Sequence, residues 1–219
     1  MVDRRLCRAA WCAAGLATAV SVVHLSAPAL NARLVSPDLV ARLLPSPGAR
    51  DDFREIAARA DFASTRFGNL LEHAELANYR GPFLYGGALD REIWSRYIVS
   101  PLIGESEPRA IDWRRPLWEH FYPRVRQETD PGEAARIVVR HLRARVGIHP
   151  GEADTDSLGS AWERGLANTR DWEWLYVAAL RSAGVAARIG EGRRAAIWDG
   201  GRWVSAPRPL IDLWSPGGQ

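Results

Sequence analysis

The sequence has 219 residues, of which 47% are hydrophobic and 25% are charged, and this is the composition of an ordinary soluble globular domain. It excludes a disordered chain and a small disulfide-rich protein. Lysine and arginine total 29 and aspartate and glutamate total 26, so the net charge is only +3, and no nucleic-acid partner is indicated. Because Cys7 and Cys12 are the two cysteines, the rest of the chain offers no thiol for a disulfide, a metal site or a nucleophile.

The amino-terminal segment has the residue order of a secretory signal or a signal anchor. Three arginines precede an uncharged, largely apolar stretch over residues 9–32, and a basic start before an apolar centre is typical of both. We therefore predict an exported protein, periplasmic or extracytoplasmic, in which residues 1–32 are either cleaved or kept as a membrane anchor. The alternative is a buried helix of a cytoplasmic protein, because a glycine and polar residues interrupt the apolar run.

Residues 33–50 are predicted to form a linker. This segment contains three prolines and Gly48, and a proline inside a helix removes a backbone hydrogen bond and clashes with the preceding turn. We therefore expect no helix there and a folded body that begins near Asp51.

A helical lead-in region is expected over residues 51–128. Asp51 and Asp52 are predicted to cap a first helix, and a third, short helix is predicted over Asp90–Val99. The apolar residues at helical spacing in the first two helices are Phe53, Ile56, Ala57 and Ala60, then Phe67, Leu70, Leu71 and Ala74.

Residues 112–126 combine four aromatic rings with four arginines. Buried rings with arginines whose charged ends reach solvent are the predicted arrangement. A stacking site for a sugar or an aromatic ligand is the alternative.

The next helix is predicted to begin at Asp130, where a capping aspartate, a first-turn proline and Glu133 follow one another. Three arginines of this helix are predicted to lie on its solvated face. The buried stripe is Ala134, Ile137, Val138, Leu142 and Val146, and the solvated arginines are Arg140, Arg143 and Arg145.

No metal site or cofactor is predicted. The acidic loop over residues 147–157, with His149, lacks an ordered ligand spacing, so it is interpreted as a solvated polar loop. His73, His120 and His141 each stand alone on helical segments and are interpreted as structural histidines.

The carboxy-terminal part predicts a helix over Thr169–Ala183 that ends at Gly184 and is buried on more than one face. Short strands are predicted over residues 185–190, 195–198 and 202–205, with a hairpin turn at Gly200 and Gly201 between the last two. Because helices come first and a small antiparallel sheet comes last, the predicted fold class is α+β.

These segments resemble the core of the transglutaminase-like superfamily. DPGEAARIVVRHLRARVGI, Asp130–Ile148, resembles its opening helix, and TRDWEWLYVAALRSAGVAAR, Thr169–Arg188, resembles its nucleophile-bearing helix and first strand. WDGGRWV, Trp198–Val204, resembles the hairpin after its catalytic histidine, and the upstream residues are similar to those of exported bacterial members. The resemblance covers Asp90–Trp214. It implies a papain-like or transglutaminase-like core over residues 129–214, in which a central helix packs on the sheet, followed by a short tail at residues 215–219.

The resemblance also implies a degenerate catalytic triad. It places Thr169 at the position of the nucleophilic cysteine, Gly192 at that of the histidine and Ala206 at that of the acid. A threonine hydroxyl without an adjacent base is a poor nucleophile, and no histidine follows His149. Asn168 or Thr169 is therefore predicted to be a helix cap, Asp171 to favour the positive helix end and Glu173 to lie at the surface.

The resulting prediction is a pseudoenzyme that binds a peptide, glycan or protein partner, or steadies an assembly at the membrane. Because Trp172 and Trp174 cannot share one buried helical face, one of them is expected to be partly exposed. The chain has ten tryptophans, and aromatic rings suit the faces of sugars and peptides. The binding candidates are Asp171, Trp172, Trp174, Arg193, Arg194, Trp198 and Trp203.

Two other functions stay open. One is an enzyme with altered, non-cysteine chemistry at the helix start, in which Thr169, Asp171 and Glu173 act with Arg193 or Arg194. The other is an unrelated α-helical, membrane-associated protein, for which the resemblance would be a coincidence of composition.

Overall fold

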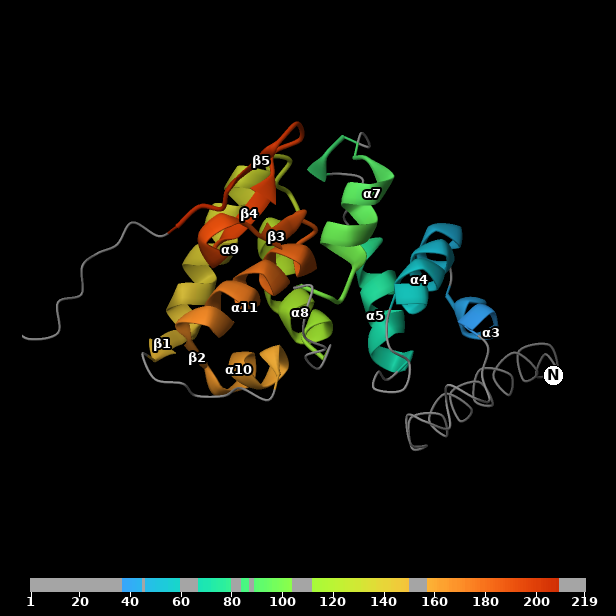
Figure 1. Cartoon of the computed structure of the whole chain (residues 1–219), viewed down its shortest axis with the longest axis horizontal. Coiled ribbons are helices and arrows are strands. Elements are labelled where there is room, and N and C mark those ends of the chain that lie inside the picture. Colours follow the sequence, from blue (N-terminus) through green and yellow to red (C-terminus); the bar gives the residue numbers. More distant parts are fainter. Residues whose placement is uncertain are drawn as a thin grey trace, which may run out of the picture.

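The structure is a computed structural model that describes residues 37–44, 46–59, 67–79, 84–86, 89–103, 112–149 and 157–208 (Figure 1). The predicted signal or anchor over residues 1–32, the tail over residues 215–219 and most of the acidic loop lie outside these ranges. Within them, no helix combines the length and the apolar character needed to cross a membrane.

The amino-terminal part of the fold is a group of helices, α3 (Pro37–Ala41), α4 (Pro47–Arg59) and α5 (Phe67–Ala77). The expectation of a linker without helix over residues 33–50 is wrong, because Pro37 and Pro47 each begin a helix. A proline is tolerated in the first turn, where its missing N–H has no intrahelical acceptor. The body therefore begins before Asp51.

Asp52 has a role that the sequence did not predict. It lies inside α4 and not at its start, and it is 1% exposed. Its carboxylate accepts hydrogen bonds from Asn78 Nδ2 of the turn after α5 and from Trp94 Nε1, each at 2.9 Å, and forms an ion pair with Arg91 at 2.5 Å. Asp52 thus links α4 to the turn after α5 and to α7 (Arg91–Trp94), whose start is capped by Asp90.

The short helix predicted over Asp90–Val99 is present, but its second half is a π-helix, η1 (Ser95–Val99). It is followed by α8 (Arg114–Val125), in which Leu117 and Phe121 are buried, as is Trp113 directly before the helix. Arg114 is also fully buried and does not extend to solvent as expected for the arginines of this segment. The backbone carbonyl groups of Ile98, Val99 and Arg181 accept its hydrogen bonds.

Helix α9 (Pro131–Arg145) begins as predicted, since Asp130 accepts a hydrogen bond from the N–H of Glu133 at 2.7 Å. It leads into β1 (Gly147–His149), which pairs in parallel with β2 (Leu166–Asn168). Helix α10 (Leu158–Arg164) lies between the two strands in the sequence. A strand at residues 147–149 corrects the prediction of a loop there. Both strands are short, and β1 is exposed along its whole length, whereas β2 buries Ala167. Each strand pairs with a partner that is distant in sequence.

Helix α11 (Thr169–Ser182) packs against α8, α9, α10 and the antiparallel sheet and lies among them in Figure 1. The sheet contains β3 (Ala187–Ile189), β4 (Ala195–Trp198) and β5 (Trp203–Ser205) in that order. A short 3-10 turn, η2 (Glu191–Arg193), joins β3 to β4. The fold is therefore α+β, with a central helix packed on a small antiparallel sheet, as the sequence predicted.

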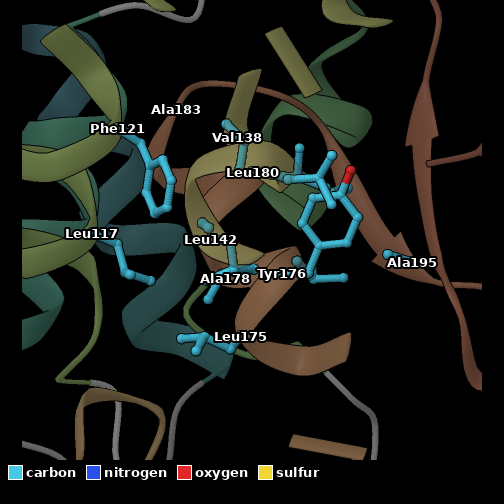
Figure 2. Packing of buried hydrophobic residues seen from close by; sticks show 14 of the residues in the cluster. Leu117, Phe121, Val138, Leu142, Leu175, Tyr176, Ala178, Leu180, Ala183 and Ala195 are labelled. Atoms are coloured by element: carbon cyan, nitrogen blue, oxygen red, sulfur yellow. The ribbon is translucent and has the colours of Figure 1, made fainter. Parts of the chain in front are cut away.

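The main core surrounds α11, as Figure 2 shows. Leu175 and Ala178 of α11 are buried together with Leu117 of α8 and Leu142 of α9. A second cluster joins α3, α4, α5 and η1 and includes Ala186, which directly precedes β3. Burial of apolar surface stabilises a fold by about 25 cal/mol per Å². Because α11 is covered on more than one side, the apolar surface buried on each of these sides stabilises the protein.

Candidate functional site

The start of α11 is closed by a reciprocal side-chain cap. Asn168 Oδ1 accepts a hydrogen bond from the backbone N–H of Asp171 at 2.8 Å, and Asn168 Nδ2 donates one to Asp171 Oδ2 at 3.0 Å. Asp171 is 1% exposed, whereas Thr169 is exposed. The prediction of a cap at this place is confirmed, with Asn168 as the capping residue. The negative charge of the Asp171 carboxylate also interacts favourably with the positive end of the helix dipole.

Glu173 connects this helix start to the sheet. Its carboxylate accepts hydrogen bonds from the backbone N–H of Ala195 in β4 at 2.9 Å and from Arg208 Nη2 at 2.5 Å. The side chain is only 13% exposed, so the expectation that Glu173 lies at the surface is wrong. An unpaired N–H at the start of a strand is costly to bury, and a nearby carboxylate is the acceptor that stabilises it.

The positions assigned to the histidine and the acid hold no titratable group. Gly192 is exposed in η2 with a φ of 66°, and Ala206 is buried directly after β5. The N–H of Ala206 donates to the carbonyl of Ala195 at 3.0 Å, so Glu173 and Ala206 bond to the same residue of β4. The structure thus brings the helix start and the end of the sheet together, but without an imidazole.

The remaining titratable neighbour, Tyr176, is a hydrogen-bond donor and not a base. Burial, together with the charge of Glu173, raises the pKa of this phenol. Its hydroxyl donates to the carbonyl of Pro207 at 2.8 Å. The proton therefore stays on the oxygen at neutral pH.

Trp172 and Trp174 divide as the helical spacing predicted. Trp172 is 6% exposed and packs against Tyr176 with ring centroids 5.5 Å apart. Trp174 is half-buried, and the guanidinium group of Arg170 lies 5.6 Å from its ring centroid. The prediction that one of the two is partly exposed is confirmed.

Trp198 and Trp203 form a cross-strand pair between β4 and β5, with ring centroids 5.6 Å apart. The ring of Tyr97 from η1 lies edge-on to Trp203 at 4.7 Å, and the guanidinium group of Arg188 from β3 lies 4.2 Å from the Trp203 ring. All four side chains are half-buried. We call Tyr97, Arg188, Trp198 and Trp203 the Trp203 cluster.

Two members of this cluster were not among the residues predicted from the sequence. Tyr97 lies in a π-helix far upstream, and only tertiary packing brings it to β5. Arg188 could have been found from strand alternation, since β3 pairs with β4 and Arg188 lies opposite Ala196. A small partner leaves room for a long side chain to reach a neighbouring ring.

The binding candidates therefore lie in separate parts of the structure. Trp172 and Trp174 pack at the start of α11, whereas Trp198 and Trp203 pack with η1 and β3. Arg193 and Arg194 are exposed in the connection from β3 to β4, and Arg193 has a left-handed φ of 58°. Among the described residues, no group of three or more metal-binding side chains is present.

Comparisons with protein-family models, with curated proteins and with solved structures find no match for this chain.

Proposed function

We propose that this protein is a non-catalytic, exported or membrane-anchored module of the transglutaminase-like kind that binds a peptide, glycan or protein partner. The observation that carries the proposal is the use of polar groups at the start of α11. Asn168 and Asp171 bond to each other, and Glu173 bonds to Ala195 and Arg208. The groups that an enzyme would need for acid and base chemistry thus serve to hold the helix start and the sheet.

The absence of catalytic side chains at the three positions of the triad supports the same function. Thr169 is exposed, and Gly192 and Ala206 carry no side chain that can transfer a proton. Acyl transfer needs a nucleophile, a base within hydrogen-bond reach and a group that orients the base. None of these three residues supplies a base or an orienting acid, so a binding role is favoured over the enzyme with altered chemistry.

The Trp203 cluster is the surface that we assign to the partner. Half-buried aromatic rings offer large apolar area at little cost in conformational entropy, and an arginine beside them adds a cation and hydrogen-bond donors. Trp198 and Trp203 come from adjacent strands that are joined by a tight turn at Asp199–Arg202, in which Asp199 Oδ1 accepts from the N–H of Gly201 and Arg202. The two rings are therefore held in place before a partner arrives.

The test uses the purified full chain on arrays of peptides and glycans, followed by titration of the best ligand by calorimetry. Trp203→Ala should lower the affinity about tenfold or more, as expected for a central aromatic contact. The matched control is Trp118→Ala, at a half-buried tryptophan of α8. Equal affinity of Trp203→Ala and the wild type would refute the assignment of this surface.

A second measurement separates binding from catalysis. A combined Thr169→Ala, Asp171→Asn and Glu173→Gln variant should keep the affinity of the wild type, and Thr169→Cys should show no transglutaminase or peptidase turnover, because a thiol alone lacks its base. Turnover in the wild type that disappears in the combined variant would instead support an enzyme with altered chemistry.

A further inference from the structure

Two histidines that stand alone in the sequence meet where α8, α9 and α10 pack together. The ring centroids of His120 on α8 and His141 on α9 are 6.3 Å apart. His120 also lies edge-on to the indole of Trp162 on α10, with centroids 4.9 Å apart. These two histidines, each alone on its own helix in the sequence, are therefore neighbours in the fold.

Arginines one turn further along each helix complete the group. Arg124 on α8 donates a hydrogen bond to the backbone carbonyl of His120. Arg145 on α9 places its guanidinium group 4.3 Å from the ring centroid of Trp162, which is 4% exposed and forms the floor beneath it. The i, i+4 spacing of His120 with Arg124 and of His141 with Arg145 puts each pair on one helix face.

The charges in this group have one sign. Burial lowers the pKa of His120 to about 4, and the neighbouring Arg124, Arg145 and His141 add to the effect. Burial also lowers the pKa of His141, with contributions from Arg124 and Arg140. Among the described residues, every charged group that shifts these two histidines is a cation. Three exposed arginines therefore surround two imidazoles that are neutral at pH 7.

One nitrogen of the group is left without a hydrogen bond. His120 Nε2 is buried and has no partner within the part of the chain that the structure describes. Because this nitrogen is closed off from solvent, the donors that can reach a ligand here are the exposed guanidinium groups of Arg124 and Arg145. Exposed guanidinium groups are donors that bind phosphate, because their planar forks match two of its oxygens.

We propose that His120, His141, Arg124 and Arg145 form a binding site for a phosphate group, carried either by a soluble phosphate compound or by a lipid headgroup. The arginines supply charge-assisted hydrogen bonds to the oxygens, and the imidazoles take up protons as the anion enters. None of these residues belongs to the Trp203 cluster or to the start of α11. The phosphate site and the proposed function can therefore fail independently of each other.

The first test measures binding of inorganic phosphate and pyrophosphate to the purified full chain by calorimetry in a chloride buffer. Saturable binding is expected that becomes tighter as the pH falls from 8 to 6, because a bound anion raises the pKa of both imidazoles. The histidine ring signals in NMR spectra should show this directly, since the chain has five histidines. If binding of the anion saturates but the pKa values of His120 and His141 do not change, the proposed site is wrong.

Variants on the same helices locate the bound anion. Arg124→Gln with Arg145→Gln should lower the affinity about tenfold or more, because charge-assisted hydrogen bonds are lost. The matched control is Arg143→Gln on α9, which is exposed and does not contribute to the shifts of either histidine. Both variants should keep the thermal unfolding midpoint within the small change that surface substitutions cause. The proposal is wrong if no saturable binding occurs at millimolar anion, or if the control loses as much affinity as the double variant.

A third arm distinguishes the sources of the phosphate. Vesicles of phosphatidylglycerol and of phosphatidylcholine are compared for the wild type and the double variant, so that any contribution of the amino-terminal segment is common to both. If the double variant binds phosphatidylglycerol vesicles more weakly than the wild type does, while the two bind phosphatidylcholine vesicles equally, the site is assigned to lipid headgroups. Equal vesicle binding, with pyrophosphate affinity still lost in the variant, would assign it to soluble phosphate compounds.

Discussion

Arg114 Nη1 donates a hydrogen bond to the backbone carbonyl of Arg181 at 2.7 Å, although both guanidinium groups are fully buried. Their acceptors are backbone carbonyls, together with the Nδ1 atom of His73 for Arg114. Arg181 bonds to the carbonyls of Ser100, Leu102 and Ala187 at 2.7 to 2.9 Å. Burial lowers the pKa of Arg181 to about 9, so its charge is kept at pH 7. The two arginines thereby tie the segment after η1 to α8, α11 and β3.

Arg114→Met should destabilise the protein by about 3 kcal/mol or more, because several buried carbonyl groups lose a charged donor. The exposed neighbour Arg115 forms an ion pair with Glu72 at 2.8 Å, and Arg115→Met should cost only about 0–1 kcal/mol. Urea unfolding followed by circular dichroism gives both values. Similar stability of Arg114→Met and the wild type would show that desolvation of the guanidinium group outweighs its hydrogen bonds.

Tyr85→Phe should destabilise the contact between the lead-in region and the sheet. The Tyr85 hydroxyl accepts from the N–H of Ala186 at 2.9 Å and donates to the carbonyl of Trp198 at 3.3 Å. Its removal leaves a buried N–H unpaired, so we expect a loss of about 1–3 kcal/mol in the free energy of unfolding. Tyr79→Phe, at a side chain that is 54% exposed, is the matched control and should change stability by no more than about 0.5 kcal/mol.

Asn168→Ala should cost about 1 kcal/mol, because α11 loses its cap and Asp171 loses its side-chain partner. Thr169→Ala, one residue further on and exposed, should have little effect on unfolding. Chemical denaturation of the two variants measures the difference. A larger loss for Thr169→Ala would contradict the assignment of the cap to Asn168.

Acid should destabilise the protein through His120. The unfolded chain binds a proton on this imidazole near its ordinary pKa of 6.5, whereas the folded protein binds it only near pH 4. The unfolded state therefore takes up more protons in this window, and stability that is present above pH 6.5 falls as the pH is lowered through it. The loss should be about 1–2 kcal/mol, less than the full shift implies, because the side chain is only partly buried.

His120→Gln should reduce this acid sensitivity, measured as the change in the free energy of unfolding between pH 7 and pH 4 in a buffer without phosphate. His149→Gln, at an exposed histidine, should retain the acid sensitivity of the wild type. An unchanged pH profile for His120→Gln would show that other groups cause the acid effect.

The sequence by itself determined the local elements of this protein. Capping residues and periodicity identified α9 from Asp130 and the burial of α11, and the glycines at residues 200–201 identified the hairpin between β4 and β5, because these signals act between near neighbours in the chain. It also determined that the three positions of the triad carry no thiol, imidazole or carboxylate. No folding can supply a thiol or an imidazole to positions that hold Thr169, Gly192 and Ala206.

Only the tertiary structure decided which distant residues meet. It placed Tyr97 against Trp203, His120 against His141 and the carboxylate of Glu173 on the N–H of Ala195. It also buried Asp52 and Arg114. Each of these outcomes depends on a partner many residues away, and a polar or aromatic side chain has no fixed role until packing sets its exposure and its hydrogen-bond partners.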